Sequence, residues 1–536
     1  MPRIVQGWAL ALWATSALSS AFAAPATANE PHVARTSQTG NPFTGAFDKY
    51  AAQFLEDWHC AGMAIGIVDG DNVFTKGFGF ATLPDHPATA DTLWYGASTT
   101  KAQLAATLAH LIDDKVYPAI SPLGWETPIS SILRDDFVMQ DAWATAHVTL
   151  NDAASHSSGF GMHDGSLMHE KDGKALTARD IVRNIRNLRP ATDPRTSFIY
   201  SNHMYIVLSH VVETLTGSGV GQTIRKYLWD PLGMSSTYFG LQEAVDSGKP
   251  IAQGYYWDNS TSEHVAIPYA HLDEISGAGA VLSSVTDYTK WISCLLKQSA
   301  PLSAAVHQDI KTPRFVSVPE PQLGLDITLY SLGWWRTMFQ GQTLFEHSGN
   351  TPSHGALVWW LPDMQYGVVV FTNTPNFSRE IIMRKIVEDK MNIDAKRRYD
   401  LAGAVAVLQK QMDDAMAHAD DLLYPNRTDS APPTGNIADL AGSYHNDGYG
   451  EIEMRVENKD GKDVLVIERP NMTFPQLFMI HHVTGDSWTA MLYPLHASAT
   501  PQGFGGVKFT FDKKHRPTGF VLTMQGEEMV TYTKAK

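Results

Sequence analysis

Apolar residues recur with two different periods along this chain. Leu104, Leu108, Leu111 and Ile112 follow the spacing of one helix face, and a second helical pattern covers residues 204–216. Short apolar runs bounded by turn residues instead predict strands, at residues 63–68, 73–80, 356–360 and 368–371. Gly217 is expected to end the second helix, and residues 345–350 are expected to follow a strand in the strand-like region that begins at Leu332. The first 400 residues therefore mix helices with strands.

The last 85 residues or so have a strand pattern throughout. Residues 452–456 and 507–511 each alternate apolar with polar or charged side chains. An amphipathic helix is expected at 402–423, and the proline-bearing stretch 424–436 reads as a linker. The pattern predicts a small C-terminal antiparallel barrel or sandwich.

The N-terminus has the pattern of a secretory signal. Arg3 supplies a positive start, residues 8–18 are apolar, and Ala21-Phe22-Ala23 is a small-x-small cleavage site. We therefore expect a signal peptide at 1–23, a main domain at 24–420, a linker at 421–435 and a barrel domain at 436–536. The mature protein is then secreted, or at least extracytoplasmic. Four Asn-x-Ser/Thr sequons start at Asn259, Asn376, Asn426 and Asn471. They would carry glycans in a eukaryotic secretory pathway.

Composition narrows the classes of partner. The 536 residues carry a formal charge of −15, so no basic excess exists to bind nucleic acid. We expect no membrane span, because the one apolar run near the N-terminus is too short. No metal-ligand motif occurs, and we expect no cofactor. Cys60 and Cys294 are the two cysteines, and a disulfide and two buried thiols are both open.

Ser98 and Lys101 carry the candidate chemistry. Ser98 lies at the mouth of a predicted helix, and Lys101 follows one turn later on the same face. A serine hydroxyl needs a base to become nucleophilic, and a buried lysine whose pKa is lowered supplies one. Backbone N–H groups at the helix start also face an oxyanion formed beside Ser98. This Ser-x-x-Lys occurs once in the chain.

Three marks stand in one order: Ser98…Lys101, then Tyr200-Ser201-Asn202, then His347-Ser348-Gly349. The set resembles the serine β-lactamase and penicillin-binding-protein superfamily, in particular the class C β-lactamase-like esterases and D-amino-acid peptidases. The C-terminal region resembles the lipocalin-like barrel that some members append. The resemblance implies an α+β fold, with an antiparallel sheet flanked by helices and an inserted helical subdomain.

The resemblance also implies roles for individual residues. Ser98 would be acylated, Lys101 would be its base, and Tyr200 would pass a proton to the leaving group. Asn202 would bind the substrate carbonyl or orient Lys101. The backbone N–H groups of Ser98 and Asn350 would form the oxyanion hole.

His347 and Gly349 belong to the third motif. We expect them to bind substrate, together with Asn202 and Asn350. His347 replaces the lysine of the β-lactamase pattern. A neutral imidazole is a poorer partner for a substrate carboxylate, which favours esters, amides or D-amino-acid peptides over β-lactams.

The leading hypothesis is a secreted serine hydrolase that acts on such a small molecule through an acyl-Ser98 intermediate. Three alternatives remain open: an acyltransferase that uses the same acyl-enzyme, a true β-lactamase, and a binding or sensor protein without turnover. The sequence leaves the oligomeric state unknown.

Overall fold

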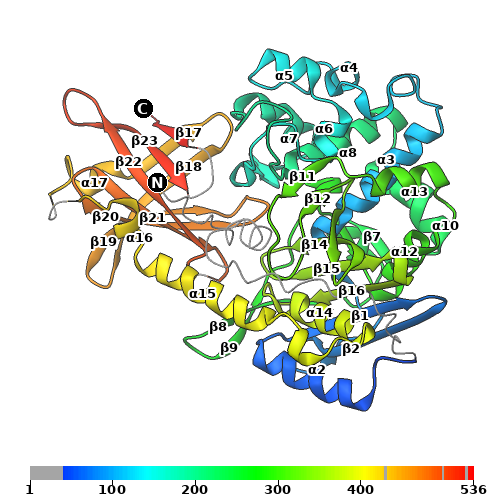
Figure 1. Ribbon diagram of the computed structural model, residues 1–536. Coiled ribbons are helices and arrows are strands. Elements are labelled where there is room, and N and C mark those ends of the chain that lie inside the picture. The colour runs from blue at the N-terminus through cyan, green and yellow to red at the C-terminus, as the bar shows by residue number, and fades with distance from the viewer. Residues whose placement is uncertain (1–39, 428–430, 498–499, 525–528, 536) are drawn as a thin grey trace.

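The computed structural model describes residues 40–427, 431–497, 500–524 and 529–535. The predicted signal peptide lies outside these ranges and stays a prediction. Figure 1 shows a large body of sheet and helices with a barrel beside it, and a long helix, α15, running between them.

A large antiparallel sheet forms the centre of the first body. Within the described residues its nine strands lie in the order β11-β12-β13-β14-β15-β16-β1-β2-β3. Strand β1 pairs with β16, so the two ends of this domain meet in the middle of the sheet. The strands are β1 Gly62–Asp69, β2 Asn72–Thr82, β3 His86–Pro87, β11 Phe315–Val318, β12 Thr328–Tyr330, β13 Trp335–Phe339, β14 Gln342–Asn350, β15 Gly355–Leu361 and β16 Tyr366–Thr372.

Both faces of this sheet are buried. In β1, Ile65 lies in a core shared with α2 (Gly45–Asp57) and α14 (Ser378–Lys390). Its neighbour Ala64 lies in a second core, which includes residues of α12 (Val285–Lys297). Successive side chains of a strand point to opposite faces, so a continuous apolar run fills both cores. The apolar runs at 63–68, 356–360 and 368–371 are the strands β1, β15 and β16.

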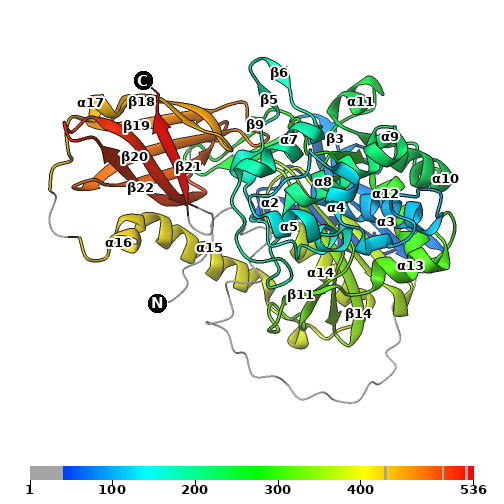
Figure 2. The ribbon, with the colours of Figure 1, turned by 90° about the horizontal axis from the view of Figure 1, so that it is seen from above.

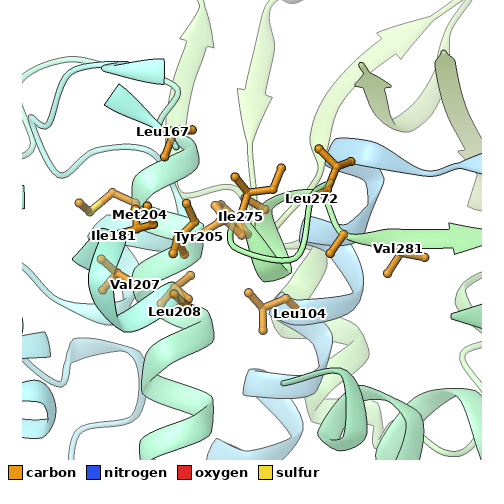
Figure 3. Close-up of a cluster of buried hydrophobic side chains, with 14 of the residues drawn as sticks. Leu104, Leu167, Ile181, Met204, Tyr205, Val207, Leu208, Leu272, Ile275 and Val281 are labelled. Carbon is orange, nitrogen blue, oxygen red and sulfur yellow. The ribbon is translucent and has the colours of Figure 1, made fainter. Parts of the chain in front are cut away.

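Between β3 and α12 the chain forms a helical subdomain. Its helices are α3 Thr100–Asp113, α4 Ile129–Leu133, α5 Ala142–His147, α6 Leu150–Ala154, α7 Ala178–Asn184, α8 Asn202–Thr216, α9 Val220–Ile224, α10 Asp230–Leu232 and α11 Leu241–Asp246. Figure 3 shows apolar side chains at its centre, with Leu104 from α3 and Tyr205 and Leu208 from α8. The predicted stop at Gly217 is confirmed, since this residue ends α8 in the left-handed region.

Two sequence-based expectations differ from the structure. Residues 345–350 were expected to follow a strand, but they belong to β14, because their pairing with β15 continues to Asn350 and Gly355. The helix expected at 402–423 is divided into α15 (Leu401–Ala417) and α16 (Ala419–Leu423). His418 leaves the helical region there, with φ −113° and ψ 25°.

The C-terminal region is a closed antiparallel barrel. Its eight strands, all within the described part of the chain, close through pairing of β17 with β24. The strands are β17 Gly442–Asn446, β18 Gly450–Lys459, β19 Lys462–Arg469, β20 Gln476–Thr484, β21 Ser487–Pro494, β22 Gly503–Phe511, β23 Pro517–Met524 and β24 Val530–Lys534. The expected barrel is confirmed, whereas its assignment as lipocalin-like and the exact domain boundaries stay predictions.

The barrel docks on a loop of the helical subdomain, residues 163–169. The Tyr449 hydroxyl lies 2.7 Å from Nδ1 of His163, and Nη1 of Arg469 donates to the Gly165 carbonyl at 2.8 Å. Farther along, the His169 backbone N–H donates to the Asn471 carbonyl at 3.1 Å. In Figure 2 the barrel lies beside the body, next to the helical subdomain.

Cys60 and Cys294 are buried free thiols, so no disulfide joins them. Burial raises the pKa of Cys60 and of Cys294 to about 11. Among the described helices, none combines the length and apolar character that a membrane crossing requires.

Candidate active site

Ser98 lies in a tight turn between a short strand and a helix. The turn runs from β4 (Trp94–Tyr95) through a 3₁₀ turn, Ala97–Thr99, into α3. Ala97 has a φ of 46°, in the left-handed region that residues with a Cβ rarely adopt. Thr99 donates to the Gly96 carbonyl at 2.8 Å and Thr100 to the Ala97 carbonyl at 2.7 Å, which stabilises this strained backbone.

The side chain of Lys101 is fully buried and aimed at Ser98. Its Nζ lies 3.0 Å from Ser98 Oγ, 2.8 Å from Asn202 Oδ1 and 2.7 Å from the carbonyl oxygen of Ala278. Burial lowers the pKa of Lys101 to about 7. A neutral amine has two N–H donors and one lone pair. When it donates to Asn202 and Ala278, its lone pair is left for the Ser98 hydroxyl proton.

The ring of Tyr200 packs against the amine of Lys101. The ring centroid is 4.9 Å from Nζ of Lys101, and the ring stacks on Trp335 with centroids 5.7 Å apart. Burial raises the pKa of Tyr200 well above its usual value, and the neighbouring Ser98 hydroxyl partly opposes this. The residue is therefore a phenol at neutral pH and has a proton to give.

Asn202 connects Lys101 to a carboxyl group that sequence reasoning missed. Asn202 is the first residue of α8, and its Nδ2 donates to Oδ2 of Asp164 at 2.9 Å. Burial raises the pKa of Asp164 to about 6, although Asn202 and Lys101 both act against the rise. The bond to Asp164 fixes the amide, so that its oxygen faces Lys101.

Strand β14 brings the third sequence mark against the nucleophile. At Gly349, a Cβ atom would lie 2.2 Å from the Gly96 carbonyl oxygen and 3.1 Å from the backbone nitrogen of Ser98. Only glycine allows the strand to come this close. The next residue, Asn350, lines the same cavity as Ser98. The structure thus brings Ser98, Lys101, Tyr200, Asn202 and the Gly349-Asn350 backbone together.

Comparison with known proteins agrees with this geometry. The family model described as Beta-lactamase matches residues 47–388. The chain belongs to the β-lactamase family. It is a hydrolase of that family, with a C-terminal eight-stranded barrel in its described part.

Among the relatives of this β-lactamase-family hydrolase are two fungal enzymes. An unguisins hydrolase of Aspergillus violaceofuscus is 36% identical over 84% of this chain and 83% of the relative. An unguisins hydrolase of Aspergillus campestris is 35% identical over 83% of each chain. The fold is similar to that of an octameric penicillin-binding protein homologue from Pyrococcus abyssi. That structure has a TM-score of 0.56, 18% identity, and coverage of 91% of this chain and 99% of the other.

His347 occupies the position where the β-lactamase pattern has lysine. Its Nδ1 lies 2.7 Å from the Ser348 carbonyl oxygen, which only accepts, so Nδ1 carries the proton. The other nitrogen, Nε2, accepts from the Tyr330 hydroxyl at 3.1 Å. Burial, with a smaller effect of Lys101, lowers the pKa of His347 to about 3. The ring is therefore neutral, and both of its nitrogens are already hydrogen-bonded.

A second histidine, His156, also borders the site and was not found from the sequence. Its ring lies 4.2 Å from that of Tyr200, and its Nδ1 accepts from the Ser201 backbone N–H at 3.0 Å. Burial lowers the pKa of His156 well below its usual value. Together with Trp335 and His347, this neutral ring packs around Tyr200.

Proposed function

We propose that this protein hydrolyses an uncharged amide or ester bond through an acyl-Ser98 intermediate, in a compound of the unguisin class. The observation that carries the proposal is the hydrogen bonding of Lys101, which leaves its lone pair directed at Ser98 Oγ at 3.0 Å. The substrate class rests on the two unguisins hydrolases, which match most of the chain.

The reaction begins with acylation. Neutral Lys101 takes the Ser98 hydroxyl proton as Oγ bonds to the substrate carbonyl carbon, and the carbonyl oxygen becomes an oxyanion. The backbone N–H groups of Ser98 and Asn350 receive that oxyanion. The carbon–leaving-group bond then breaks as Tyr200 gives its proton to the leaving nitrogen or oxygen. Lys101 returns its proton to the Tyr200 phenolate.

Water completes the turnover. Neutral Lys101 takes a proton from a water molecule as the water oxygen attacks the acyl carbon. The bond to Ser98 Oγ breaks, and Ser98 recovers the proton from Lys101. The products are a carboxylic acid and the released amine or alcohol.

Replacing Ser98 tests this proposal. We expect Ser98→Ala to reduce the turnover of a purified unguisin by about 10⁶-fold, since removal of a covalent nucleophile has an effect of this order. Mass spectrometry of the wild type should show an acyl adduct on the Ser98 peptide. As a control for folding, the circular dichroism spectrum should match that of the wild type. Ser98→Ala activity above about a hundredth of the wild-type value would contradict the mechanism.

A further inference from the structure

The cavity at Ser98 does not end at the hydrolase domain. A single cavity of about 360 Å³ is lined by Ser98, Asn202 and Asn350 on one side and extends into the barrel. There its walls are apolar side chains from six strands: Ile452, Ile467, Phe478, Leu492, Leu522 and Tyr532. Strand β8 (Gly254–Asp258) and helix α15 add Tyr256 and Met412 to the wall.

Strand register shows how deep the open part of the barrel extends. Ile467 pairs with Phe478, and Phe478 with Leu492, so these wall residues form one layer. The next inward layer pairs Leu465 with Ile480, and both are buried in the core. Beyond it, the rings of Trp488 and Phe509 pack together with their centroids 5.6 Å apart, and neither residue lines the cavity. The barrel is therefore filled at its far end and open toward Ser98.

Polar groups lie where the part of the cavity at Ser98 meets the part inside the barrel. Arg469, itself buried, donates from Nη2 to the Tyr449 carbonyl at 2.7 Å and from Nη1 to the Gly165 carbonyl at 2.8 Å. Gly165 directly follows Asp164, the carboxyl group that fixes Asn202. The open end of the barrel is thus held against the loop that completes the active site.

The wall composition indicates which part of the substrate enters the barrel. Ser98 and Asn350 line the cavity, whereas Tyr200, Lys101 and His347 lie outside its wall. Tyr200 protonates the leaving group in the proposed mechanism, so the leaving group lies on the Tyr200 side of Ser98. The acyl part then faces the cavity and the barrel.

We propose that the open end of the barrel is a binding subsite for the acyl part of the substrate and takes a large apolar side chain of a peptidic acyl group. This inference rests on the proposed acyl-Ser98 mechanism. The apolar wall stabilises such a side chain by removing it from water. Arg469 and Gln476 are polar residues of the cavity wall, and they suit the peptide carbonyl groups that follow the apolar side chain.

Neighbouring residues of β23 provide a matched test. Leu522 lines the cavity, whereas the next residue, Val521, is also partly buried but points to the opposite face of the strand. Leu522→Trp should narrow the subsite, Leu522→Ala should widen it, and Val521→Trp is the control. The substrates are p-nitrophenyl acetate and the p-nitrophenyl ester of an N-acetylated Phe-Phe dipeptide.

For the dipeptide ester we expect Leu522→Trp to raise KM by about tenfold or more and Leu522→Ala to raise it severalfold. Val521→Trp should leave hydrolysis of both substrates within about twofold of the wild type, and the Leu522 variants should change KM for the acetate much less than KM for the dipeptide ester. An unchanged KM for the dipeptide ester in Leu522→Trp would overturn the proposal. Equal losses on both esters in both Leu522 variants, or the same KM increase in Val521→Trp, would also overturn it.

The two proposals fail in different ways. If Ser98→Ala still hydrolyses both esters, the acyl-enzyme mechanism is wrong. If hydrolysis depends on Ser98 but the Leu522 variants keep the wild-type preference for the dipeptide ester, only the barrel subsite is wrong.

Discussion

Burial, rather than an ion pair, sets the protonation state of Lys101. Among the described residues no carboxylate lies in salt-bridge contact with its amine, and the charge of Asp164, which raises the pKa of Lys101, has a smaller effect than burial. Desolvation disfavours the charged form, so the amine of Lys101 loses its proton at a lower pH than the amine of an ordinary lysine does. This single group therefore connects the packing of the site to its activity.

The rate should follow the titration of Lys101. With a pKa of about 7, the amine is protonated below that pH and cannot accept the Ser98 proton. We expect kcat/KM for a neutral ester to fall about tenfold for each pH unit below 7 and to level off above it. Asp164→Asn removes the charge that raises the pKa of Lys101, so the acidic limb should move to lower pH. A limb at the same pH in both proteins would show that another group is titrating.

His347 should determine the preference for substrate charge. The ring is neutral at working pH because its pKa is about 3. We expect the wild type to hydrolyse neutral acyl esters well and cephalosporins poorly. His347→Lys should shift the ratio of kcat/KM toward the cephalosporin by about 1.5–3 kcal/mol, the range for a hydrogen bond to a charged group.

His347→Gln, which stays neutral, is the control and should leave that ratio unchanged. Efficient hydrolysis of a cephalosporin by the wild type would contradict this expectation and restore the β-lactamase alternative.

The sequence identified some site residues and missed others for a physical reason. Local spacing at a helix start indicates the chemistry of Ser98 and Lys101, whereas the resemblance to the family's motifs pointed to Tyr200 and Asn202. Asp164 lies in a loop with no such spacing, and only the packing of that loop against α8 brings it to Asn202. Tertiary contacts of this kind leave no local pattern in a single sequence.

At the scale of elements, the close approach of β14 to the Ser98 turn depends on Gly349. A methyl group there would lie 2.2 Å from the Gly96 carbonyl oxygen, so one backbone must move. We expect Gly349→Ala to lower kcat/KM by about 100-fold, the effect of losing one oxyanion donor, because the Asn350 N–H moves with the strand. The free energy of unfolding should fall by about 1–3 kcal/mol.

Gly45→Ala is the control for this substitution. Gly45 begins α2 and has no atom within 4 Å of where a Cβ would be. It should leave activity and stability unchanged. A Gly349→Ala enzyme that keeps more than half of its activity would show that the close approach is not needed.

Strands and helices with a clear period were predicted well, and the errors fall where the period is interrupted. The apolar run of β1 and the alternation of β18 carry their own signal. Residues 346–350 (Glu-His-Ser-Gly-Asn) lack the apolar residues that predict a strand, although they belong to β14. They form a strand because β15 pairs with them residue by residue, which no property of their own sequence reveals.

At the scale of the whole molecule, one network of buried apolar side chains runs through both domains. It includes Leu104 in α3, Trp360 in the sheet and Trp488 in the barrel. Multidomain chains often unfold in several steps, but we expect this chain to unfold in a single cooperative transition, because neither part can lose its packing without exposing the other. Differential scanning calorimetry measures this, with esterase activity followed over the same temperatures. Two separated transitions, with activity surviving the first, would show that the domains unfold independently.

The two native thiols have a practical consequence for work on this protein. Thiol-reactive dyes attack the thiolate, and Cys60 and Cys294 are both buried with pKa values of about 11. A cysteine introduced at Leu522 would therefore be labelled selectively, with no need to remove a native one. A fluorophore coupled there, larger than the side chain of Leu522→Trp, would fill the proposed subsite, and the unlabelled Leu522→Cys protein would be its control.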